Sequence, residues 1–198
     1  ELVAVGSRAA ERAGAFSASL GLSVKALTYE DLLSTSDVDV VYIATPTGCH
    51  REHCLLALDA GKAVLCEKPL AMNAIEARQV AAAAGRAGLF CMEAMWMRFM
   101  PVMADLRVLL DRKAIGTPLV FRAALGHQLT GGGSTSRLDA TLGGGATLDL
   151  GAYLVSLASM VFGPHPDVVV AKGALSPNGV DETMSAVLRY AAGGVASL

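Results

Sequence analysis

The sequence is poor in charged and in aromatic residues. Of its 198 residues, 17% are Asp, Glu, Lys or Arg, 5% are Phe, Trp or Tyr, and the formal net charge is −2. A net charge this close to zero gives no electrostatic reason to expect nucleic acid or an anionic membrane surface as a partner. We find no apolar run that approaches the ~18 residues needed to span a bilayer, and therefore expect no membrane partner.

The four cysteines, at positions 49, 54, 66 and 91, show no disulfide framework. A reducing, cytoplasmic setting is therefore the default expectation. We also predict no secretory leader, because Glu1 opens directly onto an apolar strand.

A glycine-rich phosphate-binding turn is missing too. A dinucleotide-binding sheet normally begins with a strand, a G-x-G-x-x-G turn and a helix. No such motif follows any early strand of this sequence. We therefore expect the chain to start at the second strand of such a sheet, without the opening βα element of about 30 residues.

The first half of the sequence alternates apolar runs with helical patterns that end at glycines. Strands are predicted at residues 2–6, 38–44, 63–66 and 89–92, the second of them buried, and helices at residues 9–20, 29–33, 50–60 and 73–87. This alternation predicts an α/β fold with a parallel, doubly wound Rossmann-type sheet. We assign it to a dinucleotide-binding domain, residues 1–95.

The second half has a different pattern. It predicts helices at residues 102–112 and 146–162, strands at 118–125, 167–174 and 183–190, and a Gly-, Ser- and Thr-rich loop at 126–145. A loop of this length suggests a functional role. We therefore predict an α+β domain with an open, mostly antiparallel sheet over residues 96–198, truncated because the pattern stops at Leu198.

Glu67, Lys68 and Pro69 end the predicted strand at 63–66. Ligands of open α/β sheets bind at the carboxyl ends of the strands. Pro69 restricts Lys68 to an extended conformation, which aims its ammonium group. The alternative is an ordinary strand end with a solvated Glu–Lys pair.

Asp149 and Tyr153 lie four residues apart in the predicted helix 146–162. This spacing places both side chains on one helical face. A phenol beside a carboxylate, near a lysine, is a workable acid–base set for carbonyl–alcohol chemistry. The alternative is that Tyr153 packs in the core and Asp149 interacts only with the helix dipole.

Ser7 and Arg8 follow the first strand, where a dinucleotide fold contacts the adenosine ribose. An acidic residue there accepts the 2′-hydroxyl, whereas Arg suits a 2′-phosphate. The pair therefore favours NADP over NAD. A solvated surface arginine is the alternative.

A cluster of Cys49, His50, His53 and Cys54 has residue types that suit zinc. Neighbouring positions fan around a helix, so four ligands within six residues cannot converge tetrahedrally. We therefore predict no metal site, and interpret His50 as a polar group at a strand–helix junction.

The segment 95–100 contains the only tryptophan. Trp96 and Arg98 are residue types that favour binding surfaces, so they could line a cofactor or substrate cleft. Soft apolar side chains filling an interdomain seam are the alternative, and the sequence does not separate the two.

Four segments together resemble a known family. They are IATPTGCHREH at residues 43–53, AGKAVLCEKPLA at 60–71, EAMWMRFMP at 93–101 and LGGGATLDLGAY at 142–153. Their sequences and spacing are similar to those of the Gfo/Idh/MocA oxidoreductases. Tyr153, where many relatives carry His, resembles the branch of sugar and dihydrodiol dehydrogenases.

The resemblance implies a Rossmann domain followed by an open-faced sheet that mediates homodimerisation or higher oligomerisation. It implies that Lys68 and Tyr153 are the catalytic pair and that Asp149 positions the substrate or tunes the pair. The NADP contacts that it implies come from Ser7, Arg8, Thr45, Pro46, His50, Glu67, Lys68, Pro69, Trp96 and Arg98.

The function implied is an NADP-dependent hydride transfer to or from a carbinol carbon of a sugar or cyclic diol, with NAD less favoured. The competing hypotheses are a non-catalytic dinucleotide-binding sensor or scaffold on the same fold, and an inactive truncated product. Retention of both Lys68 and Tyr153 argues against a pure binder.

Overall fold

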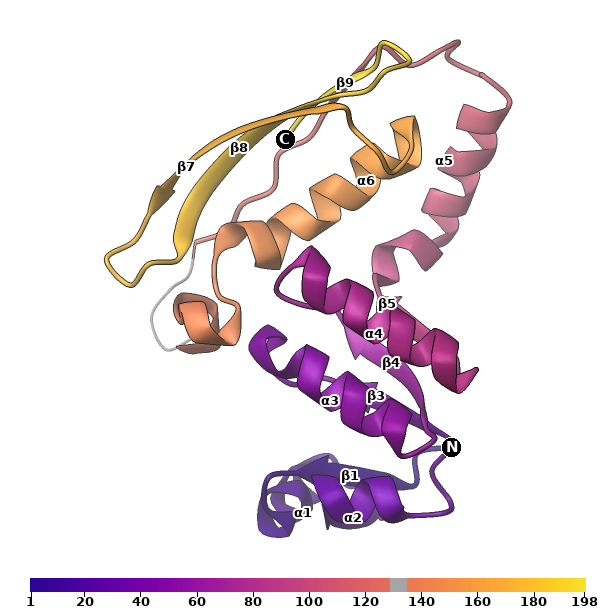
Figure 1. Ribbon diagram of the computed structural model, residues 1–198, viewed down its shortest axis with the longest axis vertical. Helices are drawn as coiled ribbons and strands as arrows, with labels where there is room; N and C mark the ends of the chain where they lie inside the picture. The colour runs from indigo at the N-terminus through magenta and orange to yellow at the C-terminus, as the bar shows by residue number, and fades with distance from the viewer. Residues whose placement is uncertain (129–134) are drawn as a thin grey trace. The chain divides into compact units, whose positions relative to one another are not determined.

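The computed structural model describes residues 1–128 and 135–198 (Figure 1). The chain forms two compact units, each described here by itself. The first comprises residues 1–45, 49–67 and 73–93, and the second residues 46–48, 68–72 and 94–198. The division into domains 1–95 and 96–198 stays a prediction.

The first unit is an alternating α/β structure. Its elements are β1 (Ala4–Ser7), α1 (Ala10–Ser19), β2 (Lys25–Thr28), α2 (Tyr29–Ser34), β3 (Val40–Ile43), α3 (Thr47–Asp59), β4 (Ala63–Glu67), α4 (Ala74–Ala87) and β5 (Cys91–Ala94). β1 pairs in parallel with β2, and β3 in parallel with β4. The predicted fold class, a Rossmann-type parallel sheet followed by a second α+β domain, is confirmed.

The strands of this unit form two sheets, β1-β2 and β3-β4-β5. In the doubly wound order, a strand would lie between these two groups. The described residues supply none that bonds to both β1 and β3. The sequence interpretation also missed β2, a four-residue strand whose Lys-Ala-Leu-Thr sequence carries little β-propensity.

β3 is not the buried strand that was predicted. Successive side chains of a strand point to opposite faces. Ile43 is only 4% exposed, whereas Val40 and Tyr42 are 54% and 55% exposed. One face of β3 is therefore covered and the other is largely exposed.

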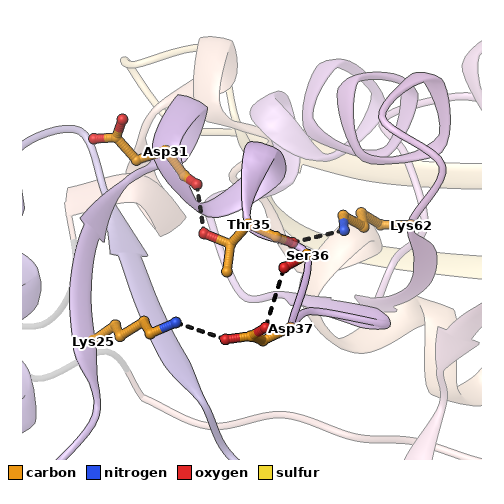
Figure 2. Close-up of polar contacts among 6 residues, drawn as sticks. All are labelled: Lys25, Asp31, Thr35, Ser36, Asp37 and Lys62. Atoms are coloured by element: carbon orange, nitrogen blue, oxygen red, sulfur yellow. Dashed lines mark hydrogen bonds and ion pairs between the residues drawn. The ribbon is translucent and has the colours of Figure 1, made fainter.

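Polar side chains connect β2 and α2 to the β3–β4 half of the unit (Figure 2). The Lys25 ammonium lies 2.7 Å from the carboxylate of Asp37, in the loop before β3. Its hydrogen bond is the main cause that holds the pKa of Asp37 below the usual value. Lys62, which precedes β4, donates to the Thr35 carbonyl at 2.8 Å. These contacts join segments whose strands do not pair directly.

The core of the first unit lies between α3, β4 and α4. Cys54, Val64, Cys66 and Val80 are fully buried there. The thiols of Cys54 and Cys66 hydrogen-bond to each other, and this bond, with burial, raises the pKa of Cys66. A raised pKa keeps the Cys66 thiol protonated, so this cysteine serves as a small core residue.

The second unit begins at the end of β5. Its elements are the 3₁₀-helices η1 (Trp96–Phe99), η2 (Thr135–Leu138) and η3 (Ala140–Leu142), the π-helix η4 (Thr147–Gly151), the helices α5 (Pro101–Asp111) and α6 (Ala152–Phe162), and the strands β6 (Val120–Arg122), β7 (Val168–Leu175), β8 (Asp181–Arg189) and β9 (Val195–Ser197). The predicted loop 126–145 is partly wrong, because residues 135–138 and 140–142 are helical. Residues 129–134 of that loop lie outside the described part.

The sheet of this unit has the order β6-β9-β8-β7. β6 and β9 are parallel, and the other two pairs are antiparallel. Figure 1 shows α6 along the sheet, where Leu154 and Ala158 pack on Ala186, Leu188 and Ala196. All eight residues of β7 are exposed, so the sheet is covered mainly on its α6 face.

One expectation about apolar runs is wrong. Among the described residues, the helical stretch 140–162 is long and apolar enough to cross a membrane by length and composition. A helix in a protein core can be as long and as apolar as this one. Here Asp149 is paired with Lys68, and Leu154 and Ala158 pack against the sheet. These contacts are those of a helix packed within the unit.

Candidate functional site

Lys68, Asp149 and Tyr153 lie together in the second unit. The Lys68 ammonium donates to Asp149 Oδ1 at 2.9 Å and to the Asp149 carbonyl oxygen at 2.6 Å. It also lies 4.7 Å from the centroid of the Tyr153 ring. The side chains of Lys68 and Asp149 are 13% and 22% exposed, so their attraction is little screened by water. The peptide bond between Lys68 and Pro69 is cis.

The helix that carries Asp149 and Tyr153 starts with a π-turn. η4 holds Asp149, and α6 follows it with Tyr153 as its second residue. π-turns are uncommon and often occur at functional sites. Asp181, at the start of β8, accepts hydrogen bonds from the Thr147 backbone N–H at 2.7 Å and from the Thr147 hydroxyl at 2.6 Å. The Asp181 carboxylate, which comes from β8, therefore caps this helix.

Three glycines fix the approach to the helix, because each meets a different segment. A Cβ atom on Gly143 would lie 2.6 Å from Thr47 Cβ, and one on Gly144 would lie 2.6 Å from the Arg137 carbonyl oxygen. A Cβ atom on Gly145 would lie 2.1 Å from Asp181 Oδ1. Real Cβ atoms do not approach other atoms this closely, so residues 143–145 must be glycine for these contacts to form.

Trp96 contacts the phenol of Tyr153. Its indole N–H donates to the Tyr153 hydroxyl oxygen at 3.0 Å, and the two rings meet edge to face at 6.0 Å. An indole nitrogen can only donate, so the Tyr153 oxygen accepts here and its own proton points elsewhere. Arg98 reaches the Ser156 hydroxyl at 3.5 Å. The structure thus attaches the segment 96–98 to the helix of Tyr153.

Arg137 reaches the same carboxylate from the other side. Its Nε lies 3.3 Å from Asp149 Oδ2. The sequence interpretation singled out neither Arg137 nor Asp181. Arg137 lies in the loop 126–145, whose length suggested a functional role without marking a particular residue, whereas no local pattern marks Asp181, 34 residues after Thr147.

A cavity of about 500 Å³ opens beside Asp149 and Arg137. Aliphatic side chains line one part of it and polar groups another: Leu138, Leu150, Leu154, Val180, Met184, His127, Glu182 and Thr183. Lys68, Tyr153 and Trp96 are not among the lining residues. Of the three residues predicted to be catalytic, Asp149 alone faces this cavity.

His50 and its neighbours form hydrogen bonds within the first unit. His50 is 1% exposed, and its Nε2 lies 2.7 Å from the Thr45 carbonyl oxygen. His53 Nδ1 lies 3.0 Å from Thr45 Oγ1, and burial is the main cause that lowers the pKa of His53. Within residues 1–128 and 135–198, no three His, Cys, Asp or Glu side chains are grouped to hold a metal ion.

The remaining predicted cofactor residues are spread over both units. In the first unit, Ser7 ends β1, Arg8 is exposed beside it, and Glu67 accepts a hydrogen bond from Tyr42. That bond raises the pKa of Tyr42 to about 12. Pro46 and Pro69 belong to the second unit. Contacts of these residues with a cofactor stay a prediction.

Comparison with known proteins gives two family matches. Residues 1–95 match the family described as "Oxidoreductase family, NAD-binding Rossmann fold", and residues 103–198 match "GFO/IDH/MocA C-terminal domain". Over 192 residues the chain is 42% identical to trans-1,2-dihydrobenzene-1,2-diol dehydrogenase of Xenopus laevis, covering 96% of this chain and 57% of that protein. The chain therefore spans little more than half the length of this relative.

Two solved structures are similar over the whole chain. KijD10, a 3-ketoreductase from Actinomadura kijaniata in complex with NADP and TDP-benzene, has 32% identity, a TM-score of 0.86 and 61% of its own length covered. The aldose–aldose oxidoreductase from Caulobacter crescentus, in complex with glycerol, has 27% identity, a TM-score of 0.89 and 62% of its length covered.

Proposed function

Because the chain belongs to the Gfo/Idh/MocA oxidoreductase family, we propose that the protein is an NADP-dependent dehydrogenase acting on a CH–OH group of a sugar or cyclic diol. Membership confirms the resemblance predicted from the four motif segments. The named diol dehydrogenase relative and the aldose–aldose oxidoreductase neighbour support this substrate class. The observation that carries the proposal is the cluster of Lys68, Asp149 and Tyr153.

Tyr153 would exchange the proton of the substrate hydroxyl. Its oxygen accepts a hydrogen bond from Trp96, which leaves the tyrosine's own proton for this exchange. The phenolate formed on proton loss is stabilised by the Lys68 ammonium, 4.7 Å from the ring centroid. Asp149 holds that ammonium through two hydrogen bonds. The dinucleotide, when bound, supplies or accepts the hydride.

Residues of the first unit fit a dinucleotide at the strand ends. Ser7, Thr45 and Glu67 stand at or just after the carboxyl ends of parallel strands, where open α/β sheets bind ligands. Arg8 is exposed beside Ser7 and suits a 2′-phosphate, which supports NADP over NAD. The proposed contacts with the dinucleotide are completed by His50, Pro46, Pro69, Trp96 and Arg98. The described residues contain no glycine-rich turn to cradle the pyrophosphate.

The second-unit sheet supports the proposed homo-oligomer. Its face opposite to α6 carries exposed apolar side chains, including Val120, Val170 and Val187. Val170 and Val187 are directly opposite each other on β7 and β8. An exposed apolar face of this kind suits contact with a second copy of the chain.

Kinetics of two variants test the enzymatic proposal. With NADP and either trans-1,2-dihydrobenzene-1,2-diol or xylose, Tyr153→Phe and Lys68→Met should each lower turnover at least ~100-fold. Tyr190→Phe is the matched control, since the Tyr190 hydroxyl is buried without a described hydrogen-bond partner and lies in the sheet core. It should turn over at nearly the wild-type rate.

Near-normal turnover in both Tyr153→Phe and Lys68→Met would contradict the mechanism. If the unaltered protein binds NADPH, as followed by cofactor fluorescence, but oxidises neither substrate, the non-catalytic sensor is favoured instead.

A further inference from the structure

Asp149 is held between two cations, one on each carboxylate oxygen. Lys68 binds Oδ1 at 2.9 Å, and Arg137 Nε lies 3.3 Å from Oδ2. The Arg137 side chain is 49% exposed, compared with 22% for Asp149 and 13% for Lys68. The arginine thus approaches the carboxylate from the solvent side, and the lysine approaches it from the interior.

The backbone fixes Arg137 in this place. Its carbonyl oxygen accepts a hydrogen bond from the Gly145 N–H at 3.1 Å, and Gly144 N–H donates to the Asp139 carbonyl at 2.9 Å. Gly144 packs so tightly against the Arg137 carbonyl that a Cβ atom would lie 2.6 Å from it. The segment 137–139 is therefore anchored to the residues that lead directly into the helix of Asp149.

From this arrangement we infer that Arg137 is a positioning residue for the proposed reaction, acting through Asp149. By holding Oδ2 it fixes the carboxylate so that Oδ1 keeps the Lys68 ammonium beside Tyr153. The inference rests on the proposed function, because the role of Arg137 is to support the Lys68–Tyr153 pair.

Of the two ion pairs of Asp149, the one with Arg137 is the more exposed. Half-exposed ion pairs add little to folding stability. Loss of Arg137 should therefore affect turnover more than the fold.

Two substitutions separate charge from packing. In the assay described above, Arg137→Gln should lower kcat about 10-fold while the KM values for NADP and the diol stay within about twofold. Arg137→Lys keeps the charge and should recover most of the lost kcat. The melting temperature of both variants should stay within about 2 °C of that of the parent protein.

A double-mutant cycle tests whether Arg137 acts through Asp149. In an Asp149→Asn background, Arg137→Gln should cause almost no further loss, because the carboxylate that it holds is gone. An equal loss of kcat in both backgrounds would overturn the inference. So would a kcat unchanged by Arg137→Gln, or a loss that Arg137→Lys does not rescue.

The outcomes also separate this inference from the proposed function. If Tyr153→Phe and Lys68→Met abolish turnover while Arg137→Gln does not reduce it, only the role of Arg137 is wrong. If Tyr153→Phe and Lys68→Met both retain turnover, the proposed function and the role of Arg137 are overturned together.

Discussion

Replacing Gly145 with alanine should destabilise the start of the helix that carries Asp149. Gly145 has a φ of +116°, a backbone conformation that side chains disfavour. Its added Cβ atom would lie 2.1 Å from Asp181 Oδ1. The Asp181 carboxylate caps the helix through the Thr147 N–H and hydroxyl. Gly145→Ala must therefore strain the backbone and push away the cap.

The expected loss is the sum of these two effects. Backbone strain at positive φ costs about 1–2 kcal/mol. Loss of a helix cap costs ~1 kcal/mol. The variant should therefore lose about 2–3 kcal/mol, which for a chain of this size lowers the melting temperature by roughly 4–12 °C. Thermal and urea unfolding followed by circular dichroism measure both quantities.

Two comparisons identify the cause. Gly163 ends α6 with a φ of +95° and no atom within 4 Å of its Cβ position, so Gly163→Ala should show backbone strain alone. In an Asp181→Ala background the cap is already absent, and Gly145→Ala should then cost ~1 kcal/mol less than in the parent. The reasoning is refuted if Gly145→Ala costs the same in both backgrounds.

Two further predictions concern the first unit. Arg8→Ala should weaken NADP binding far more than NAD binding in fluorescence titrations, because only NADP has the 2′-phosphate; equal losses for the two cofactors would count against that contact. His53 has a pKa below its ordinary value of 6.5, mainly because burial disfavours the charged ring. Just below pH 6.5, His53 therefore binds more protons in the unfolded chain than in the native chain. The contribution of His53 to the free energy of unfolding is present above that pH and is lost as the pH falls through the lower native pKa. Urea unfolding at several pH values between about 7 and about 5 should show a smaller fall for His53→Gln than for the parent, and equal slopes would exclude this histidine as a source of the pH dependence.

The sequence was sufficient to predict the fold class because its signals are local. Apolar runs, helical spacing and glycines that end helices are each readable within a few residues. Gly88, for example, ends α4 in the left-handed conformation, as its position after a helical pattern suggested. β2 and β9 were missed for the opposite reason. Each has only three or four residues, and each pairs in parallel with a strand from an earlier part of the sequence, β2 with β1 and β9 with β6.

In the candidate site, too, the local features could be predicted and the contacts between distant residues could not. The spacing of Asp149 and Tyr153 is a local feature, and their shared helix was expected. The π-turn was not, since it depends on contacts from other segments. Trp96 bonds to a tyrosine 57 residues away, and no pattern near either residue indicates the pairing. Partners of this kind are visible only after folding.

The glycines at 143–145 explain why so much of the site depends on distant residues. Each lacks a side chain where a different segment approaches: Thr47, the Arg137 carbonyl, and Asp181. Close approach at these three points brings the helix cap and the arginine to the turns that hold Asp149. A local Gly-Gly-Gly sequence, read alone, indicates flexibility. In this fold it does the reverse, because the absent side chains allow three segments to pack against the turn that leads into the helix of Asp149.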